Sequence, residues 1–196
     1  MLIELIRHGL TALNAAGCYQ GSTDEPLSPA GAAALHPAGY CPKTVYVSPL
    51  CRTAQTAKYI FPEAGQIVVP GLAEMDFGAF EGRSFAQMEH DAAYRKWVDG
   101  GCLGRCPGGE SKEEFTRRVQ GAFAALVDEA LARGENYLVI VAHGGTQMAA
   151  LEGFARPRRD FFAWQTKPGC GWVLDASRWQ AERLLTVTGE TNYTEG

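Results

Sequence analysis

Two histidines follow strand-like apolar runs, and each is followed by glycine. Residues 2–6 lead into His8, and residues 137–142 lead into His143. Because ligands of α/β proteins bind at the carboxyl ends of parallel strands, both imidazoles could face one pocket. A neutral imidazole can attack phosphorus if cations offset the charge of the phosphate oxygens and an acid protonates the leaving oxygen. The pair therefore suggests phosphoryl chemistry.

Two arginines are placed to supply those cations. Arg7 directly precedes His8, and at a strand's end the chain leaves the sheet, so both side chains can turn toward one ligand. Arg52 falls in the first turn of a helix predicted to begin at Ser48 and Pro49. Its guanidinium and that helix N-terminus would both favour an anion.

Composition excludes several classes of partner. The chain has 196 residues, 46% of them hydrophobic, and its 18 Lys and Arg against 22 Asp and Glu give a formal net charge of −4. This charge balance, with no long run of basic residues, argues against nucleic acid as a binding partner. No stretch has the length of a membrane span, and an N-terminal strand pattern containing Glu4 is unlike a signal peptide. We expect a cytoplasmic protein with no membrane partner, either a monomer or a homodimer.

The six cysteines are scattered along the chain. With no secretory context, reduced thiols are the default expectation. Cys102 and Cys106 have the spacing of half a metal site, but no second Cys or His pair accompanies them. We expect no metal.

Strand-like runs indicate the sheet that must position the histidines. Four runs are β-branched and poorly alternating, as expected of parallel strands buried on both faces. Residues 171–175 and 183–188 alternate more and predict an antiparallel hairpin at the sheet edge. Residues 189–196 are predicted to be a loose tail. The four runs are residues 2–6, 44–47, 67–69 and 137–142.

Helix signals fall between these strands. Ser28-Pro29 and Ser48-Pro49 predict helices over 29–36 and 49–60, each with a serine N-cap. Ser111 and Glu114 fit a capping box for a long helix that ends at Gly134, and another helix should follow His143. The alternation predicts an α/β fold: one domain, 1–196, with helices on both sides of a mostly parallel central sheet that has an antiparallel C-terminal edge.

Residues 76–109 do not fit the alternation. They contain aromatic residues among glycines and charges, without a strand pattern. The segment is either a cap insertion over the active site or an irregular surface connection with its own aromatic cluster. The aromatic residues are Phe77, Phe80, Phe85, Tyr94 and Trp97.

An ordered set of sequence blocks resembles the histidine phosphatase superfamily, in its phosphoglycerate-mutase-like branch. The likeness covers most of the chain and implies a phosphoglycerate-mutase-like fold. The blocks are residues 7–14 (RHGLTALN), 19–21 (YQG) with Asp24, 26–28 (PLS) with Gly31, 48–57 (SPLCRTAQTA), 72–82 (LAEMDFGAFEG), 107–111 (PGGES) and 142–145 (AHGG).

The resemblance implies a role for each matched residue. His8 would be the nucleophile that forms a phosphohistidine, while Arg7, Arg52 and His143 would bind and stabilise the phosphoryl oxygens. Glu74 would be the general acid for the leaving alcohol and then the base for water. No metal or other cofactor is needed.

Some of these assignments have alternatives. Asp76 and Glu81 are close to Glu74 in sequence, and either could be the acid instead. Asn14 would donate another hydrogen bond to the phosphoryl group or would cap its local turn. Gln20 and Gly21 would lie against the pocket rim.

The resemblance does not determine the reaction. Phosphoglycerate mutases of the family carry a longer central insertion and a His-Tyr pair after the acidic residue, whereas Met75 and Asp76 follow Glu74 here. The chain therefore favours hydrolysis of a small phosphomonoester. Likeness to α-ribazole phosphatase-type proteins indicates α-ribazole 5'-phosphate as a candidate substrate. The alternatives are a mutase, a non-catalytic phosphate-binding protein and a two-histidine metal protein, which the flanking arginines oppose.

Overall fold

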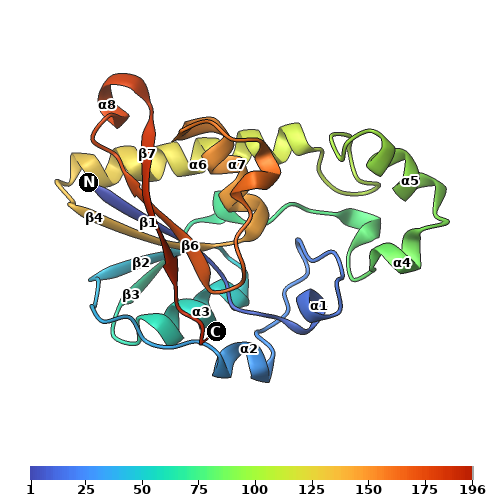
Figure 1. Ribbon diagram of the computed structural model, residues 1–196, viewed down its shortest axis with the longest axis horizontal. Coiled ribbons are helices and arrows are strands. Elements are labelled where there is room, and N and C mark those ends of the chain that lie inside the picture. Colours follow the sequence, from blue (N-terminus) through green and yellow to red (C-terminus); the bar gives the residue numbers. More distant parts are fainter. Residues whose placement is uncertain (196) are drawn as a thin grey trace.

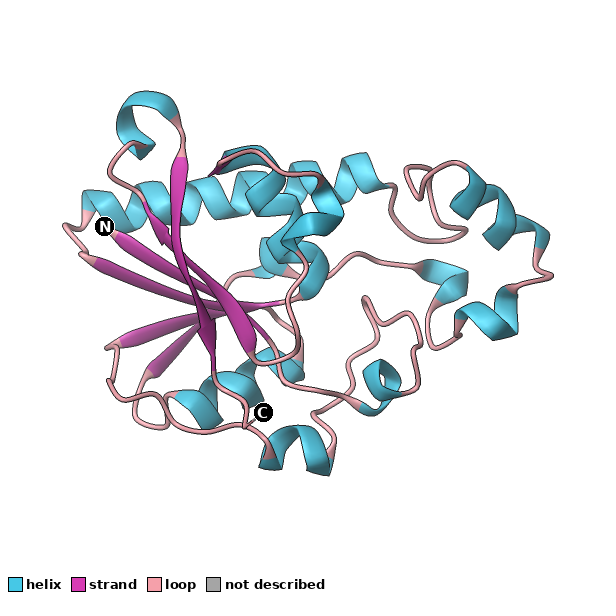
Figure 2. Ribbon diagram, viewed as in Figure 1, coloured by secondary structure: helices cyan, strands magenta, loops and turns pink. Residues whose placement is uncertain are grey.

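A seven-stranded mixed sheet lies at the centre of the computed structural model, which describes residues 1–195 (Figures 1 and 2). The strand order is β3-β2-β4-β1-β6-β7-β5. The first four strands run parallel, β6 is antiparallel to β1, and β7 is antiparallel to β6. The predicted α/β class, the parallel centre and the antiparallel C-terminal edge are confirmed. The strands are β1 (Leu2–Arg7), β2 (Thr44–Val47), β3 (Gly65–Val68), β4 (Tyr137–Ala142), β5 (Ala155–Arg156), β6 (Cys170–Asp175) and β7 (Leu185–Asn192).

Helices cover both faces of the sheet (Figure 2). Helices α6 and α7 pack on one face and α3 on the other, so β1 sends Leu5 into one core and Ile6 into the other. This alternation follows from the strand period of two. The helices are α1 (Ala12–Ala15), α2 (Pro29–Ala33), α3 (Cys51–Ile60), α4 (Phe85–Met88), α5 (Ala92–Asp99), α6 (Lys112–Ala132), α7 (Gly144–Phe154) and α8 (Trp179–Glu182), with 3-10 turns η1 (Pro70–Leu72), η2 (Gly78–Phe80) and η3 (Phe161–Trp164).

Helix starts confirm the predicted caps at Ser28 and Ser111 and correct the one at Ser48. Ser111 and Glu114 form the expected capping box of α6, and Gly134 follows the helix with a φ of 71°. Ser48 does not cap α3, which begins at Cys51. The Cys51 N–H instead donates to Asp24 at 2.7 Å, and the Ser48 hydroxyl is bonded elsewhere, as described below.

The C-terminal residues are more ordered than predicted. Strand β7 continues to Asn192, and Tyr193 is buried and donates to the Glu4 carboxylate at 2.6 Å. The prediction of a loose tail from residue 189 is wrong. A buried carboxylate needs hydrogen-bond donors, and the Tyr193 hydroxyl supplies one to Glu4 of β1, which fixes the end of the chain. The link before β7 also contains α8, which buries Trp179. Gly196 lies outside the described residues.

Residues 76–109 form an extension beside the sheet, with η2, α4 and α5 (right side of Figure 1). As expected, no strand occurs there. Phe80, Tyr94 and Trp97 are buried in the same cluster as Phe115 of α6, so the extension shares its core with the main body. Its role as a cap remains a proposal.

No helix in residues 1–195 is both long and apolar enough to cross a membrane.

Candidate active site

The parallel pairing of β1 with β4 brings the two histidines together. Arg7 is in register with Ala142, and the His8 N–H donates to the Ala142 carbonyl at 2.9 Å. The rings of His8 and His143 lie edge to face, with centroids 5.1 Å apart. The predicted sharing of one site by both imidazoles is therefore observed.

His8 is held in the form that a nucleophile requires. Its Nδ1 lies 2.7 Å from the Gly9 carbonyl oxygen, which can only accept, so Nδ1 carries the hydrogen and the lone pair is on Nε2. Burial lowers the pKa of His8 well below its usual value, and the charges of Arg52 and Arg7 lower it further. The ring is therefore neutral at neutral pH, with only 4% of the residue exposed.

Arg52 is fully buried and fixed by three acceptors. It donates from Nη1 to the Thr23 carbonyl at 2.7 Å, from Nη2 to the Gly21 carbonyl at 2.8 Å, and from Nε to His143 at 3.3 Å. A guanidinium has five N–H groups, so two remain for a ligand. The α3 N-terminus contributes less than predicted, because the Cys51 N–H is already taken by Asp24.

His143 is neutral and bonded through both ring nitrogens. Nδ1 accepts from Arg52, so Nε2 carries the hydrogen and donates to Ser48 Oγ at 2.7 Å. Burial lowers the pKa of His143 well below its usual value, with further lowering by His8 and Arg52. A phosphoryl oxygen would reach either nitrogen only by replacing one of these partners. Ser48 thus belongs to the site through its contact with His143, although its sequence pattern predicted only a helix N-cap.

Two buried polar atoms, one in Arg7 and one in Asn14, have no hydrogen-bond partner among the described residues. Arg7 donates from Nη1 to the Thr166 carbonyl at 2.6 Å, but its Nε is buried and unpaired. Oδ1 of Asn14 is also buried and unpaired, so this side chain does not cap the local turn. Thr11 caps it, because its hydroxyl oxygen accepts from the Asn14 N–H at 3.2 Å. Most buried polar atoms in proteins have a hydrogen-bond partner, so these two atoms are candidates to contact a ligand.

Glu74 is the carboxyl group held at the start of α7, in the field of Arg52 and Arg7. Its Oε1 accepts from the Met75 N–H at 2.9 Å and its Oε2 from the Gly145 N–H at 2.8 Å. Burial raises the pKa of Glu74, although these two hydrogen bonds and the charges of Arg52 and Arg7 oppose the rise. A raised pKa suits a general acid, which must carry a proton when the leaving group departs.

The neighbouring carboxylates are occupied by structural contacts. Glu81 accepts from the N–H groups of Gly21 and Ser22 and from the Thr23 hydroxyl. Burial raises the pKa of Glu81, but these hydrogen bonds outweigh that effect and lower it overall. Asp76 accepts from the Gly78 N–H and the Ser22 hydroxyl. The geometry therefore favours Glu74 among the three candidates.

The loop at Gln20 and Gly21 lies at the site, but neither residue offers a free polar side chain. Gln20 accepts from the Thr11 hydroxyl at 2.7 Å and donates to Glu25 at 3.0 Å. Gly21 approaches the chain so closely that a Cβ there would lie 1.7 Å from the Met75 carbonyl oxygen. Their observed role is to hold the loop whose carbonyls bind Arg52.

Two glycines after His143 make room for charged side chains. A Cβ on Gly144 would lie 3.3 Å from Cζ of Arg7, and one on Gly145 would lie 2.2 Å from Oε1 of Glu74. The sequence shows the two glycines, but only the fold shows that they leave room for Arg7 and Glu74.

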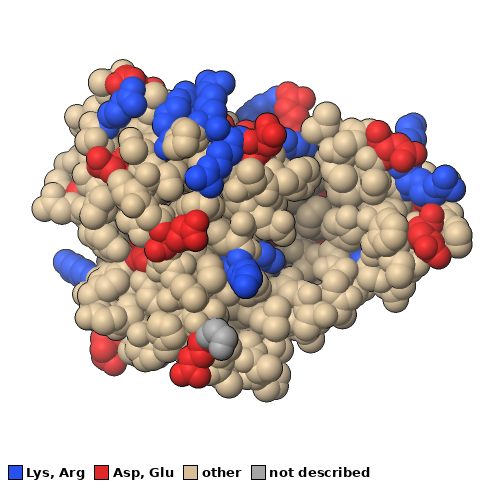
Figure 3. All heavy atoms as spheres, in the orientation of Figure 1, with Lys and Arg blue, Asp and Glu red and all other residues tan. Residues whose placement is uncertain are grey.

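A cavity of about 290 Å³ opens beside this group. Figure 3 shows this face of the molecule hollowed between the sheet body and the α4–α5 extension. Arg7, Asn14, Gln20 and Glu74 line the cavity, whereas His8, Arg52, His143 and Gly21 are not part of its lining. Its remaining wall is largely apolar, with Tyr19, Phe77, Trp97, Phe115, Phe161 and Phe162.

The site has no metal-binding donor set among residues 1–195, in which no group of three or more His, Cys, Asp or Glu is placed to hold an ion. Cys106 is buried and Cys102 lines the cavity, both as free thiols. Burial raises the pKa of each thiol, to about 11 for Cys106.

Comparison with known proteins identifies the family. Residues 3–185 match the model of the histidine phosphatase superfamily, branch 1. The chain belongs to this superfamily, whose members include phosphatases and mutases.

Histidine phosphatase relatives carry different activities in their names. A Hydrogenobacter thermophilus protein named provisionally as phosphoserine phosphatase 2 is 34% identical over 74% of this chain and 73% of its own length. A protein of Enterobacter sp. (strain 638) named probable phosphoglycerate mutase GpmB is 34% identical over 72% of this chain and 69% of its own. The crystal structure of the alpha-ribazole phosphatase from Shigella flexneri superimposes with a TM-score of 0.82 at 22% identity, covering 100% of this chain and 98% of that one. This last likeness concerns the fold.

Proposed function

We propose that this histidine phosphatase hydrolyses phosphomonoesters through a phosphohistidine on Nε2 of His8. The observation that carries the proposal is the fixed tautomer of His8, which leaves the Nε2 lone pair free near the charges of Arg7 and Arg52. The lone pair attacks phosphorus, and the bond from phosphorus to the ester oxygen breaks. The Glu74 carboxyl group gives its proton to that oxygen, which leaves as the alcohol.

Water completes the cycle in the second step. Glu74, now a carboxylate, takes a proton from water while the water oxygen attacks phosphorus. The bond between phosphorus and Nε2 breaks, inorganic phosphate leaves, and His8 is neutral again. Glu74 is protonated once more and ready for the next ester.

Four cationic or polar groups would bind the phosphoryl oxygens. Arg52 keeps two N–H groups, and the unpaired Nε of Arg7 supplies another donor. Asn14 can contribute its amide nitrogen, and His143 can donate if a phosphoryl oxygen replaces Ser48. Preorganised donors of this kind stabilise charge that develops in the transition state.

For the substrate, we propose an ester of an alcohol that carries a ring, with α-ribazole 5'-phosphate as the candidate. Tyr19, Phe77 and Trp97 line the cavity, and aromatic walls suit a planar base. Phe80 and Tyr94 of the same segment lie in the core and do not line the cavity.

Mutase activity is the second candidate, supported by the name of the Enterobacter relative. A phosphoglycerate mutase must also hold a carboxylate. Besides Arg7, Lys112 is the one cation among the described lining residues of the cavity, and it is paired with Glu152 at 3.1 Å. This pairing favours hydrolysis over mutase activity.

The central test is turnover and trapping without metal. Purified protein in EDTA is expected to hydrolyse p-nitrophenyl phosphate and, after acid-free denaturation, to retain acid-labile phosphate on the chain. His8→Ala should abolish both, whereas His90→Ala, at a side chain 90% exposed, should change neither. Full activity of His8→Ala, or a requirement for added metal, would overturn the mechanism.

A panel of esters tests the substrate proposal. We expect kcat/KM for α-ribazole 5'-phosphate to exceed that for phosphoserine and for 3-phosphoglycerate. Trp97→Ala should reduce the first value more than the other two, because only the ring-bearing ester contacts the aromatic wall. A preference for 3-phosphoglycerate, with 2-phosphoglycerate as product, would establish the mutase instead.

A further inference from the structure

We propose that Arg118, paired with Glu110, is a positioning residue for Glu74: it holds the backbone of the general acid in place. The inference rests on the proposed acid role of Glu74. It gives a purpose to the residues 107–111 block, which the mechanism above does not use.

Glu74 lies on backbone that has no regular structure of its own. Residues 73–77 fall between η1 and η2 and belong to neither helix nor strand. A catalytic side chain loses rate when it moves by as little as 1 Å, and irregular segments are the parts of a fold that open most readily. Something outside the segment must therefore fix it.

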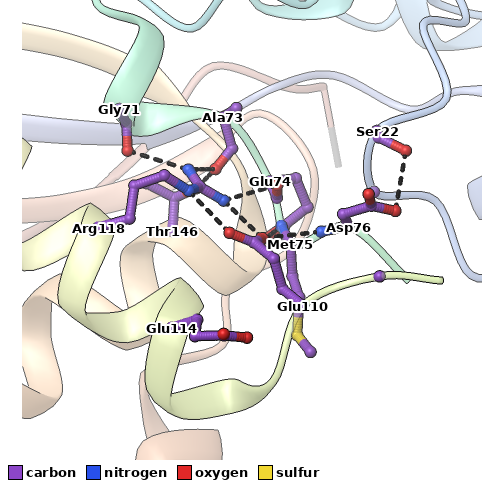
Figure 4. A network of polar contacts seen from close by, with 12 residues as sticks. Ser22, Gly71, Ala73, Glu74, Met75, Asp76, Glu110, Glu114, Arg118 and Thr146 are labelled. Carbon is purple, nitrogen blue, oxygen red and sulfur yellow. Dashed lines mark hydrogen bonds and ion pairs between the residues drawn. The ribbon is translucent and has the colours of Figure 1, made fainter. Parts of the chain in front are cut away.

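Arg118 supplies that support from the second turn of α6, the longest helix. Nη1 donates to the carbonyl oxygens of Gly71 and Ala73, at 3.1 and 3.0 Å, and Nη2 donates to the carbonyl of Glu74 at 3.2 Å. Figure 4 shows the guanidinium facing these carbonyls from the helix. One planar fork thus binds three carbonyls of the segment that ends at Glu74.

Glu110 fixes the guanidinium and the far side of the same segment. Its two carboxylate oxygens accept from Nε and Nη2 of Arg118, at 2.9 and 2.7 Å. Its Oε2 also accepts from the Asp76 N–H at 3.0 Å, and its own N–H donates to the Asp76 carbonyl at 2.8 Å. Hydrogen bonds therefore hold residues 71–76 on both sides of Glu74, from Arg118 before it and from Glu110 after it (Figure 4).

Close packing leaves the clamped segment little room to shift. A Cβ on Gly71 would lie 2.4 Å from Cβ of Ala122 on α6, and the Thr146 hydroxyl of α7 donates to the Leu72 carbonyl at 3.2 Å. Because the side chains of Arg118 and Glu110 are only 29% and 23% exposed, their ion pair is screened less than a surface pair.

Lysine cannot replace this fork. Its ammonium is a point charge that can reach Glu110 but cannot bind three carbonyls in one plane. Arg118→Lys should therefore loosen residues 71–76 while keeping the charge. Water would then reach the Glu74 carboxyl group more freely, and the pKa that burial raises would fall toward its ordinary value.

The experiment measures kcat/KM for two aryl esters over a range of pH, because this constant covers the steps up to departure of the alcohol. Phenyl phosphate needs a protonated acid, whereas p-nitrophenyl phosphate, with a good leaving group, needs it little. For Arg118→Lys we expect kcat/KM for phenyl phosphate to fall roughly tenfold or more, with less than a threefold loss for p-nitrophenyl phosphate. The alkaline limb of the phenyl phosphate profile should move to lower pH.

The matched control is Arg117→Lys on the same helix. Arg117 pairs with Glu113 through side chains 72% and 79% exposed, so this variant should leave both esters and the pH profile unchanged. Unfolding temperatures of both variants show whether folding is intact at the assay temperature. Loss of both esters by the same factor in folded Arg118→Lys, or an unmoved alkaline limb, would overturn the proposal.

A double variant separates this proposal from the function on which it rests. Glu74→Gln should itself produce the selective loss for phenyl phosphate, and Arg118→Lys added to it should cause no further selective loss. If Glu74→Gln affects both esters equally, the acid role of Glu74 is wrong. If Glu74→Gln is selective but the two variants multiply their effects, Arg118 does not act through Glu74.

Discussion

At the scale of single residues, the two glycines after His143 determine how closely charged side chains can approach. Gly145 donates its N–H to Glu74, and a Cβ there would lie 2.2 Å from Oε1 of the same carboxyl group. An alanine must therefore push the carboxyl group out of the position in which the Gly145 N–H binds it. The glycine is needed for space and not for an unusual backbone angle.

Gly145→Ala tests this account. We expect kcat/KM for phenyl phosphate to fall by about 100-fold, the order of loss that misplacing a catalytic group by an ångström can cause. Gly121→Ala is the control, because Gly121 is exposed on α6 with nothing within 4 Å of its Cβ position. That variant should keep full activity and gain up to about 1 kcal/mol in unfolding free energy from helix propensity. Equal activities of the two variants would contradict the spatial role of Gly145.

The sequence predicted which side chains lie at the site, but not their hydrogen-bond partners. His8, His143, Arg7, Arg52 and Glu74 were all found from the sequence and all lie at one site. Their partners could not be found in this way, because the acceptors of Arg52 are backbone carbonyls of Gly21 and Thr23, and any residue type supplies a carbonyl. Sequence patterns carry side-chain chemistry and contain no signal for such contacts.

At the scale of elements, α3 illustrates a local pattern overridden by a tertiary contact. Ser48 before Pro49 is a typical N-cap signal, yet the Ser48 hydroxyl accepts from the His143 ring. The cap role passes to Asp24, 27 residues earlier in the chain, which accepts from the Cys51 N–H. Strands β1, β2 and β4 and helix α6 were predicted well because their signals are local. The replacement of Ser48 by Asp24 as the cap depends on the tertiary fold.

Asp24→Ala tests the long-range cap. Loss of an N-cap acceptor typically costs about 1 kcal/mol, and we expect a loss of that size in the free energy of unfolding by urea. Because Arg52 is the next residue in α3, kcat/KM should also fall. Glu63→Ala, at an exposed residue after the same helix, should change neither quantity. An unchanged unfolding free energy in Asp24→Ala would mean that solvent caps the helix equally well.

At the scale of the whole molecule, the site lies where the sheet buries two imidazoles without a charge partner. His8 and His143 are 4% and 0% exposed, and burial lowers the pKa of each well below its usual value. Neutral His8 is what the attack on phosphorus needs. The same burial makes folding depend on pH, because the unfolded chain can protonate both rings more readily than the folded one.

The sign and size of that dependence can be predicted. Below about pH 6.5, the ordinary pKa of histidine, the unfolded state binds more protons, so stability falls as pH falls. Each ring contributes at most about 1.4 kcal/mol per pH unit until its lowered folded pKa is reached. Glu74, whose pKa is raised, acts in the opposite direction over its own range. The histidine contribution must therefore be taken from a difference between variants.

Urea unfolding between about pH 7.5 and pH 5 should isolate the contribution of His8 protonation to the unfolding free energy. Toward acid pH, wild type is expected to lose stability more steeply than His8→Asn. The difference between their unfolding free energies should stay constant above about pH 6.5 and change only below it. His90→Asn, at an exposed side chain, should follow the wild-type curve. A constant difference between wild type and His8→Asn at every pH would mean that His8 is protonated equally in both states. The neutral nucleophile, on which the proposed mechanism depends, would then have to be abandoned.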